Sequence, residues 1–142
     1  MTRVDFYITP NPAMDMRLQL VCRIAEKAYN TSHRVYIHTD DSQLANKLDD
    51  LLWTFRQGSF IPHCQANDQH AADCAVVIGQ TLPDNQPQVL INLADQVPAF
   101  FSRFERIAEI VAGDEPTRQA ARTRYKYYRE RGYPLETHEL NS

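Results

Sequence analysis

Short apolar runs alternate with longer stretches of helical periodicity over much of this chain. Residues 4–9 and 34–39 are rich in β-branched and aromatic side chains, a composition typical of strands. Residues 15–29 and 41–55 repeat apolar positions every three or four residues, which predicts two amphipathic helices. A strand, a helix of about four turns and another strand, in repetition, favour a mostly parallel sheet.

The second half continues this pattern less regularly. Residues 74–78 and 89–93 are uninterrupted apolar runs, which are typical of strands buried on both faces. We expect a helix over residues 98–104, since proline is tolerated in a first turn. Residues 107–111 fit either the end of that helix or one more strand. A last helix is expected over residues 116–131.

The composition is that of a globular protein. Of the 142 residues, 43% are hydrophobic and 23% are charged. We therefore expect a single α/β domain over residues 1–142, with a mostly parallel central sheet flanked by helices. This architecture is Rossmann-like but without a nucleotide-binding loop, because the four glycines form neither a G-x-G-x-x-G nor a P-loop pattern. No cofactor is expected.

Several features favour a cytoplasmic protein. The amino-terminal residues do not have the pattern of a signal peptide, and no apolar run approaches the ~20 residues of a membrane span. Three cysteines at irregular spacing suit a reducing compartment better than a disulfide framework. A pI near 5.9 argues against a dedicated DNA-binding protein.

One cluster has the side chains that zinc prefers, but no catalytic residues are predicted. The cluster consists of His63, Cys64, His70 and Cys74. Its spacing matches no zinc knuckle, and no third group is evident that would orient a Cys–His nucleophile pair. We expect no metal site; a small hydrolase or metal enzyme stays as an alternative that depends on this cluster.

Positive charge is concentrated near residues 118–131. Six of the fifteen basic residues lie there, in a chain with a net charge of −3. Four residues spaced four, three and four apart form one helical stripe with Lys126 beside it: Arg118, Arg122, Tyr125 and Arg129. We expect this stripe to lack acidic partners one turn away, so that an anionic ligand would relieve its repulsion. Arginine and tyrosine suit carboxylates and phosphates alike.

Two aromatic residues lie near the predicted end of the second helix and beyond it. Trp53 and Phe60 either fill the core or form an exposed aromatic surface for a protein partner. Phe60 lies in residues 59–63, which we expect to form a loop or an edge segment because a proline interrupts them.

Several motifs occur in collinear order along most of the chain. They are Phe6-Tyr7, residues 20–25, Arg34-Val35, Leu52-Trp53, Ser59-Phe-Ile-Pro-His63, and residues 122–129 followed by Gly132-Tyr133. In this order the sequence resembles the chi subunit family of the bacterial DNA polymerase III holoenzyme, an accessory protein of the clamp loader. Residues 65–97 match only loosely.

The resemblance implies an α/β fold without catalytic activity and two protein partners. The acidic carboxyl-terminal tail of single-stranded-DNA-binding protein (SSB) would bind at Arg122, Tyr125, Lys126 and Arg129, with Val111 as an apolar neighbour. The psi subunit would bind near Trp53 and Phe60. A helicase of the XPD type is a further partner that the resemblance suggests. It implies no direct specific nucleic-acid contact and no membrane contact; the alternative is a protein that binds single-stranded nucleic acid directly through its basic helix.

Overall fold

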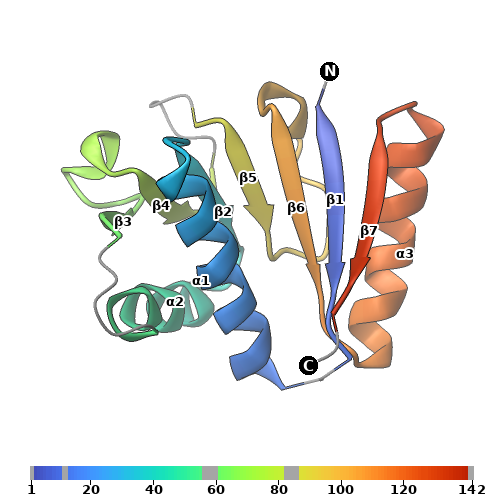
Figure 1. The fold of residues 1–142 in the computed structure, drawn as a ribbon, viewed down its shortest axis with the longest axis horizontal. Coiled ribbons are helices and arrows are strands. Elements are labelled where there is room, and N and C mark those ends of the chain that lie inside the picture. The colour runs from blue at the N-terminus through green and yellow to red at the C-terminus, as the bar shows by residue number, and fades with distance from the viewer. Residues whose placement is uncertain (1, 11–12, 56–60, 82–86, 141–142) are drawn as a thin grey trace.

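The computed structural model describes residues 2–10, 13–55, 61–81 and 87–140. Within these ranges seven strands form one sheet in which every neighbouring pair is parallel (Figure 1). The strands are β1 (Arg3–Ile8), β2 (Val35–His38), β3 (His63–Gln65), β4 (Val76–Gly79), β5 (Val89–Asn92), β6 (Arg106–Val111) and β7 (Leu135–Glu139). Their order across the sheet is β3-β4-β2-β5-β6-β1-β7.

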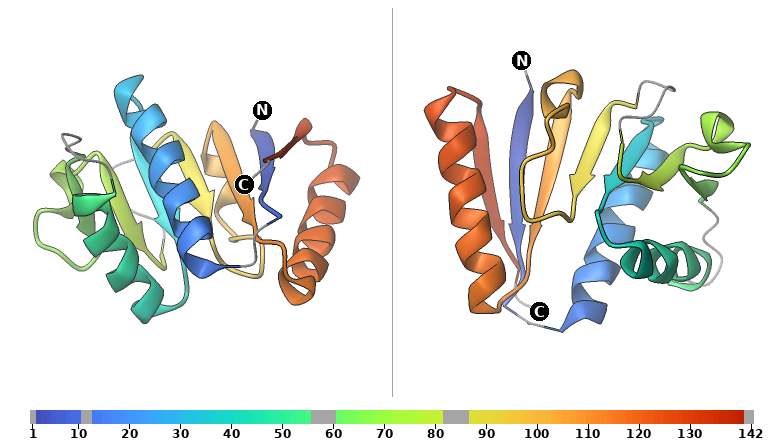
Figure 2. Two further views of the ribbon diagram at one scale, coloured as in Figure 1. Left: turned by 60° about the horizontal axis from the view of Figure 1, so that its bottom comes forward. Right: turned by 180° about the vertical axis from the view of Figure 1, so that it is seen from behind.

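Helices cover both faces of the sheet, as the parallel crossovers require. Helices α1 (Met14–Asn30) and α2 (Ser42–Thr54) lie on one face, and α3 (Glu115–Glu130) lies on the other (Figure 1 and Figure 2). The described residues also form two short 3₁₀ turns, η1 (Ala71–Asp73) and η2 (Phe101–Arg103).

The two faces have separate cores. On the α1 face, the apolar positions of α1 and α2 pack against alternate residues of β2, β4 and β5, including Val35, Ile37 and Ile91. On the α3 face, the intervening strand residues, such as Tyr36 and Leu90, pack against the segment around η2 and against α3, which contributes Tyr128. Each central strand is thus buried on both sides, which explains its continuous apolar sequence.

The structure confirms the predicted α/β class and most of the predicted elements. Residues 107–111 form strand β6 and not the end of a helix, since Ile107 to Val111 are all buried between the two helix layers. The second helix begins at Ser42, one residue after the predicted start. Its cap is Asp41, whose Oδ1 accepts from the N–H groups of Gln43 at 2.9 Å and Leu44 at 3.3 Å.

Two elements differ from the sequence prediction. Residues 98–104 contain only the turn η2, because Phe101 and Phe104 point into the core from a segment too short for a helix. Strand β7 was not predicted. Its five residues, Leu-Glu-Thr-His-Glu, are exposed or half-buried at the edge of the sheet, so they lack the apolar pattern of the inner strands.

Candidate functional site

Helix α3 is fixed at both ends by its own sequence. Its cap is Asp114, whose Oδ2 accepts from the N–H of Thr117 at 3.1 Å and from its hydroxyl at 2.7 Å. Those hydrogen bonds lower the pKa of Asp114. The helix is followed by Gly132, whose φ of +79° is the left-handed conformation that glycine adopts most easily.

The inner side of α3 is held by a buried carboxylate. Glu109 on β6 is fully buried and pairs with the guanidinium of Arg124, whose Nε lies 2.8 Å from Oε1. Tyr128 donates its hydroxyl to Oε2 at 2.7 Å, and the amide of Asn92 donates to Oε2 at 3.0 Å. Burial, and next the charge of Glu109, raise the pKa of Tyr128, which therefore stays a donor.

One of the six cations of the segment lies on this inner side and does not face the solvent. Arg124 is only 3% exposed, and its guanidinium donates to the carboxylate of Glu109 and to the carbonyl of Asp95. The expectation that the stripe lacks acidic partners one turn away is wrong for Lys126 beside it, whose partner Glu130 is four residues further on, while the partner of Arg122 lies seven residues before it. Arg122 pairs with Glu115 at 3.1 Å, and Lys126 lies 3.9 Å from Glu130.

These outer ion pairs leave the cations available. The Arg122 and Lys126 side chains are 61% and 67% exposed, and exposed pairs contribute only about 0–1 kcal/mol because water screens them. A ligand with several carboxylates can therefore displace Glu115 and Glu130 at little cost in free energy.

A pocket of about 160 Å³ opens beside these cations, between α3 and the strands β1, β6 and β7. Its apolar lining consists of Phe6, Ile8, Val111, Ala121 and Tyr125. Its polar lining consists of Arg118, Arg122 and Thr137. The ring of Tyr125 packs edge-on against Phe6, with centroids 5.3 Å apart, so the aromatic wall is held in place by the core.

Three of the five residues predicted for the SSB tail line this pocket: Val111, Arg122 and Tyr125. Lys126 and Arg129 are exposed on α3 but do not line it. The sequence prediction missed Phe6, Ile8, Ala121 and Thr137 as lining residues. Phe6 and Ile8 alternate on β1 and so share a face, which was visible in the sequence; Thr137 lies on the unpredicted strand.

The residues predicted for psi lie elsewhere. Trp53 projects from α2 and is 53% exposed, which makes it an exposed large apolar side chain. Its ring lies 4.5 Å from the imidazole of the buried His63. Phe60 lies outside the described residues.

Residues of the cluster considered for zinc make other interactions in the structure. The ring nitrogens of His63 lie 2.7 Å from the carbonyl of Ile61 and 3.0 Å from that of Asp49. Cys64 and Cys74 form a disulfide, contrary to the expectation of free thiols, and Cys22 is free and buried. Within the described ranges, one group of His and carboxylate ligands could hold an ion: Asp5, Glu136 and His138. Arg3 already pairs with both of its carboxylates, and Arg106 pairs with Asp5.

Comparison with known proteins decides the family. The sequence profile described as "DNA polymerase III chi subunit, HolC" matches residues 1–136. The chain belongs to the chi subunit family of DNA polymerase III. A chi subunit of Pseudomonas aeruginosa is 44% identical over 140 residues, which cover 99% of this chain and 98% of that protein. The chi subunit of Escherichia coli K12 is 32% identical, with 96% and 97% of the two chains covered.

A third chi subunit, from Haemophilus influenzae, is 27% identical over 96% of each chain. Membership of this family makes the chain an accessory subunit of a replicative polymerase. Among the helices that the structure describes, none has the length and apolar character needed to cross a membrane.

Proposed function

We propose that this chi subunit is a non-catalytic adaptor of the clamp loader that binds the SSB tail at the α3 pocket and psi at the α2 side. It would act in the cytoplasm, at the replisome. The observation that supports the tail site is the pocket itself, an apolar recess with Arg118 and Arg122 at its edge. The resemblance to the chi family implies that the SSB tail is acidic and ends in a phenylalanine carboxylate, and such a tail matches both features.

The size of the pocket suits one aromatic ring. A cavity of about 150 Å³ is enough to hold benzene, and this pocket measures about 160 Å³. Burying a phenylalanine side chain contributes about 1.5–3 kcal/mol. The terminal carboxylate would lie beside Arg122 and Arg118, where guanidinium groups can bind it with two hydrogen bonds. Acidic residues further along the tail would reach Lys126 and Arg129.

The first test is calorimetry with a peptide that ends in Asp-Ile-Pro-Phe. Several exposed ion pairs and one buried ring predict a dissociation constant in the micromolar range or weaker, roughly −8 kcal/mol at most. Binding should weaken at high salt, and a peptide with an amidated carboxyl terminus should bind much less well. Equal affinity of the amidated peptide would contradict the proposed role of the arginines.

Variants locate the site. Arg122→Ala should weaken tail binding by roughly tenfold, and Lys126→Ala should weaken it as well, through its more distant charge. Thr137→Phe should block the pocket from the exposed edge strand without disturbing the core. The matched control is Arg103→Ala, which removes an exposed arginine outside the pocket. Unchanged titrations of Arg122→Ala and Thr137→Phe would refute the site.

Tight binding of bare single-stranded DNA at moderate salt would favour the direct nucleic-acid binder instead.

The psi site is tested with the aromatic residues. Trp53→Ala should impair binding of psi and leave binding of the tail peptide unchanged, because α2 and the tail pocket lie on opposite faces of the sheet. Phe60→Ala should have the same effect if psi binds as the resemblance implies. Loss of both partners in either variant would indicate misfolding and would not support the assignment. The same variants decide whether a helicase of the XPD type uses this surface.

A further inference from the structure

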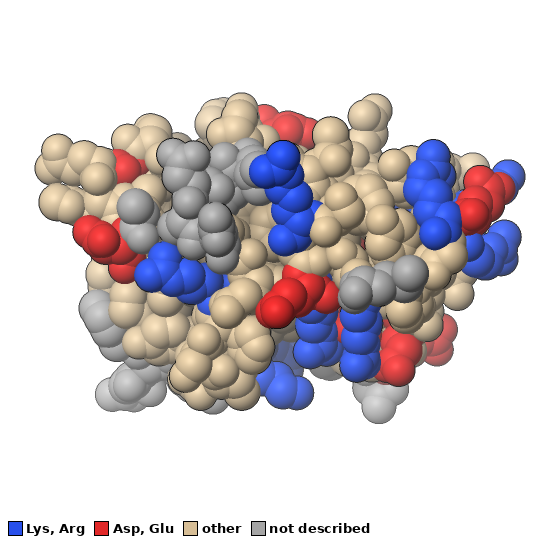
Figure 3. All heavy atoms as spheres, turned by 90° about the horizontal axis from the view of Figure 1, so that it is seen from above, with Lys and Arg blue, Asp and Glu red and all other residues tan. Residues whose placement is uncertain are grey.

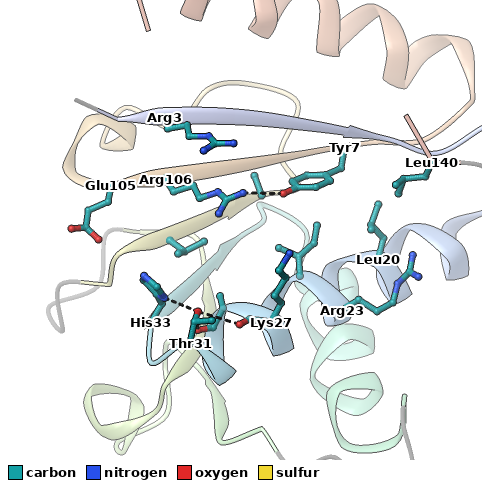
Figure 4. A pocket seen from close by; sticks show the side chains of 14 residues that line it. Arg3, Tyr7, Leu20, Arg23, Lys27, Thr31, His33, Glu105, Arg106 and Leu140 are labelled. Carbon is teal, nitrogen blue, oxygen red and sulfur yellow. Dashed lines mark hydrogen bonds between the residues drawn. The ribbon is translucent and has the colours of Figure 1, made fainter. Parts of the chain in front are cut away.

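A second and larger pocket lies on the other face of the sheet. It measures about 670 Å³, which is in the usual range of small-molecule sites, about 300–1,000 Å³. It runs between α1 and the strands β1, β5 and β6 (Figure 4). The tail pocket is lined by Phe6 and Ile8 of β1, whereas this pocket is lined by Arg3 and Tyr7, which face the opposite side.

The pocket combines an apolar floor with a cationic edge. The floor is formed by aliphatic side chains of α1 and the sheet: Leu20, Ile24, Ala28, Val89, Ala108 and Leu140. Four cations line it, Arg3, Arg23, Lys27 and Arg106, against a single acidic lining residue, Glu105. In Figure 4 the Lys27 side chain rises from α1 toward Tyr7 and Arg106. Figure 3 views the molecule from the end where the strands begin, and basic side chains lie close together near its lower middle, next to an acidic one.

A buried carboxylate holds the arginines in position. Asp5 is fully buried and accepts from Arg106 Nε at 2.8 Å, from Arg3 Nη2 at 3.3 Å and from His138 Nε2 at 3.1 Å. Arg106 also donates to the hydroxyl of Tyr7 at 3.3 Å. A guanidinium has five N–H donors, so Arg106 and Arg3 keep donors that can point at a ligand.

The two cations that α1 contributes to the pocket, Arg23 and Lys27, differ from the two arginines of the strands in this respect. Within the part of the chain that the structure describes, neither Arg23 nor Lys27 has a side-chain hydrogen bond or an ion pair, and both are exposed. Cations that surround an apolar recess in an acidic protein repel one another, and an anion between them would remove that repulsion.

We propose that this pocket binds a nucleotide, with its phosphate between Lys27, Arg106 and Arg3 and its base on the aliphatic floor. A dianionic phosphate matches an ammonium group and two guanidinium groups. The flat, largely apolar base would fill the part of the pocket that a phosphate ion alone would leave empty. Since the charged contacts are to phosphate, binding would be independent of the base sequence. The nucleotide can be free, with a dianionic phosphate monoester, or part of a single strand, with singly charged phosphodiesters; both sources present phosphate oxygens to the cations.

An amide-resolved NMR titration with thymidine monophosphate tests this proposal. Shifts are expected along the second half of α1 and in β6, and not around the tail pocket. Lys27→Ala should weaken binding about tenfold, whereas Lys27→Arg should retain it. The matched control is Lys47→Ala, since Lys47 is an exposed lysine of α2 outside the pocket. Because Lys27 is exposed and has no side-chain partner in the described structure, its removal should leave the thermal melt unchanged.

Other probes separate the sources and the alternatives. Tighter binding of oligothymidylate, competed by the mononucleotide, would support the single-strand source; equal or weaker binding of oligothymidylate would support the free nucleotide. Binding of thymidine as tight as that of its monophosphate would overturn the phosphate site. A glutamate oligopeptide that binds as well as the nucleotide would make this a surface for acidic protein segments and would overturn it too. The absence of shifts in α1 and β6 would have the same consequence.

Discussion

Gly113, which lies two residues after the end of β6, has a steric role at the residue scale. A Cβ built at this position would collide with the backbone carbonyl of Pro10, which cannot move as a side chain could. Glycine is therefore required because the chain after β1 crosses directly over it.

We expect Gly113→Ala to destabilise the fold by about 1–3 kcal/mol, since the backbone around Pro10 must shift. Urea unfolding of the two proteins measures this difference. Gly132→Ala is the comparison: it meets no atom within 4 Å but adopts a positive φ, so its cost should be about 1–2 kcal/mol. A neutral Gly113→Ala would show that the two segments are not in contact.

The sequence predicted the polar site residues only in part, and Arg124 shows why. Ala121, Arg124 and Tyr128 are spaced three and four apart and form the buried side of α3. Arginine is normally exposed, so the spacing alone does not identify Arg124 as a buried, ion-paired residue. The signal lay in another element: Glu109 is a lone acid within the apolar residues 107–111, and a buried charge needs a partner. Sequence spacing cannot connect residues that only the sheet brings together.

At the scale of elements, Asp5 joins three neighbouring strands. It lies on β1, and it accepts hydrogen bonds from Arg106 on β6 and His138 on β7. Burial alone would raise its pKa, but the hydrogen bonds from His138 and Arg106 outweigh burial, and the pKa lies below the usual 3.8. A carboxyl group with a lowered pKa stabilises the fold above pH 3.8, and that stabilisation is lost as the pH falls through its folded pKa.

Asp5→Asn should therefore lower the free energy of unfolding by about 2 kcal/mol at neutral pH, because two arginines lose a buried charged partner. The difference from the unaltered protein should shrink in acid, below about pH 4. Urea unfolding at a series of pH values measures it. Glu136→Gln, at an exposed partner of Arg3, is the control and should change stability little. A difference that stays constant into acid would contradict the lowered pKa.

Elements with strong periodicity were predictable, and those defined by tertiary contacts were not. Helices α1, α2 and α3 and the inner strands have apolar patterns that agree with their burial. Strand β7 has no such pattern, since it is held by its pairing with β1 and by contacts such as that of Tyr7 with His138, whose rings stack 4.8 Å apart. The wall that Thr137 adds to the tail pocket could not be foreseen for the same reason.

At the scale of the whole molecule, the sheet separates the proposed partner sites. The tail pocket lies on the α3 face, while Trp53 projects from α2 on the other face. The two sites share no residue in the described ranges.

We therefore predict that the tail peptide and psi bind simultaneously and independently. The dissociation constant of the tail peptide should be the same, within about twofold, whether or not psi is present in saturating amounts. Calorimetric titration of the peptide into the preformed complex measures this. A markedly altered affinity would mean that the sites are coupled through the sheet.

The strand order has a consequence for biosynthesis. β1 is translated before the strands that pair with it in the described structure, β6 and β7, which lie about a hundred residues further along. The nascent chain must therefore carry an unpaired apolar strand, with Val4 and Phe6 uncovered, until residues 106–139 have left the ribosome. Such a segment is a binding site for chaperones and a starting point for aggregation, so slow translation or early termination before β6 should yield insoluble product.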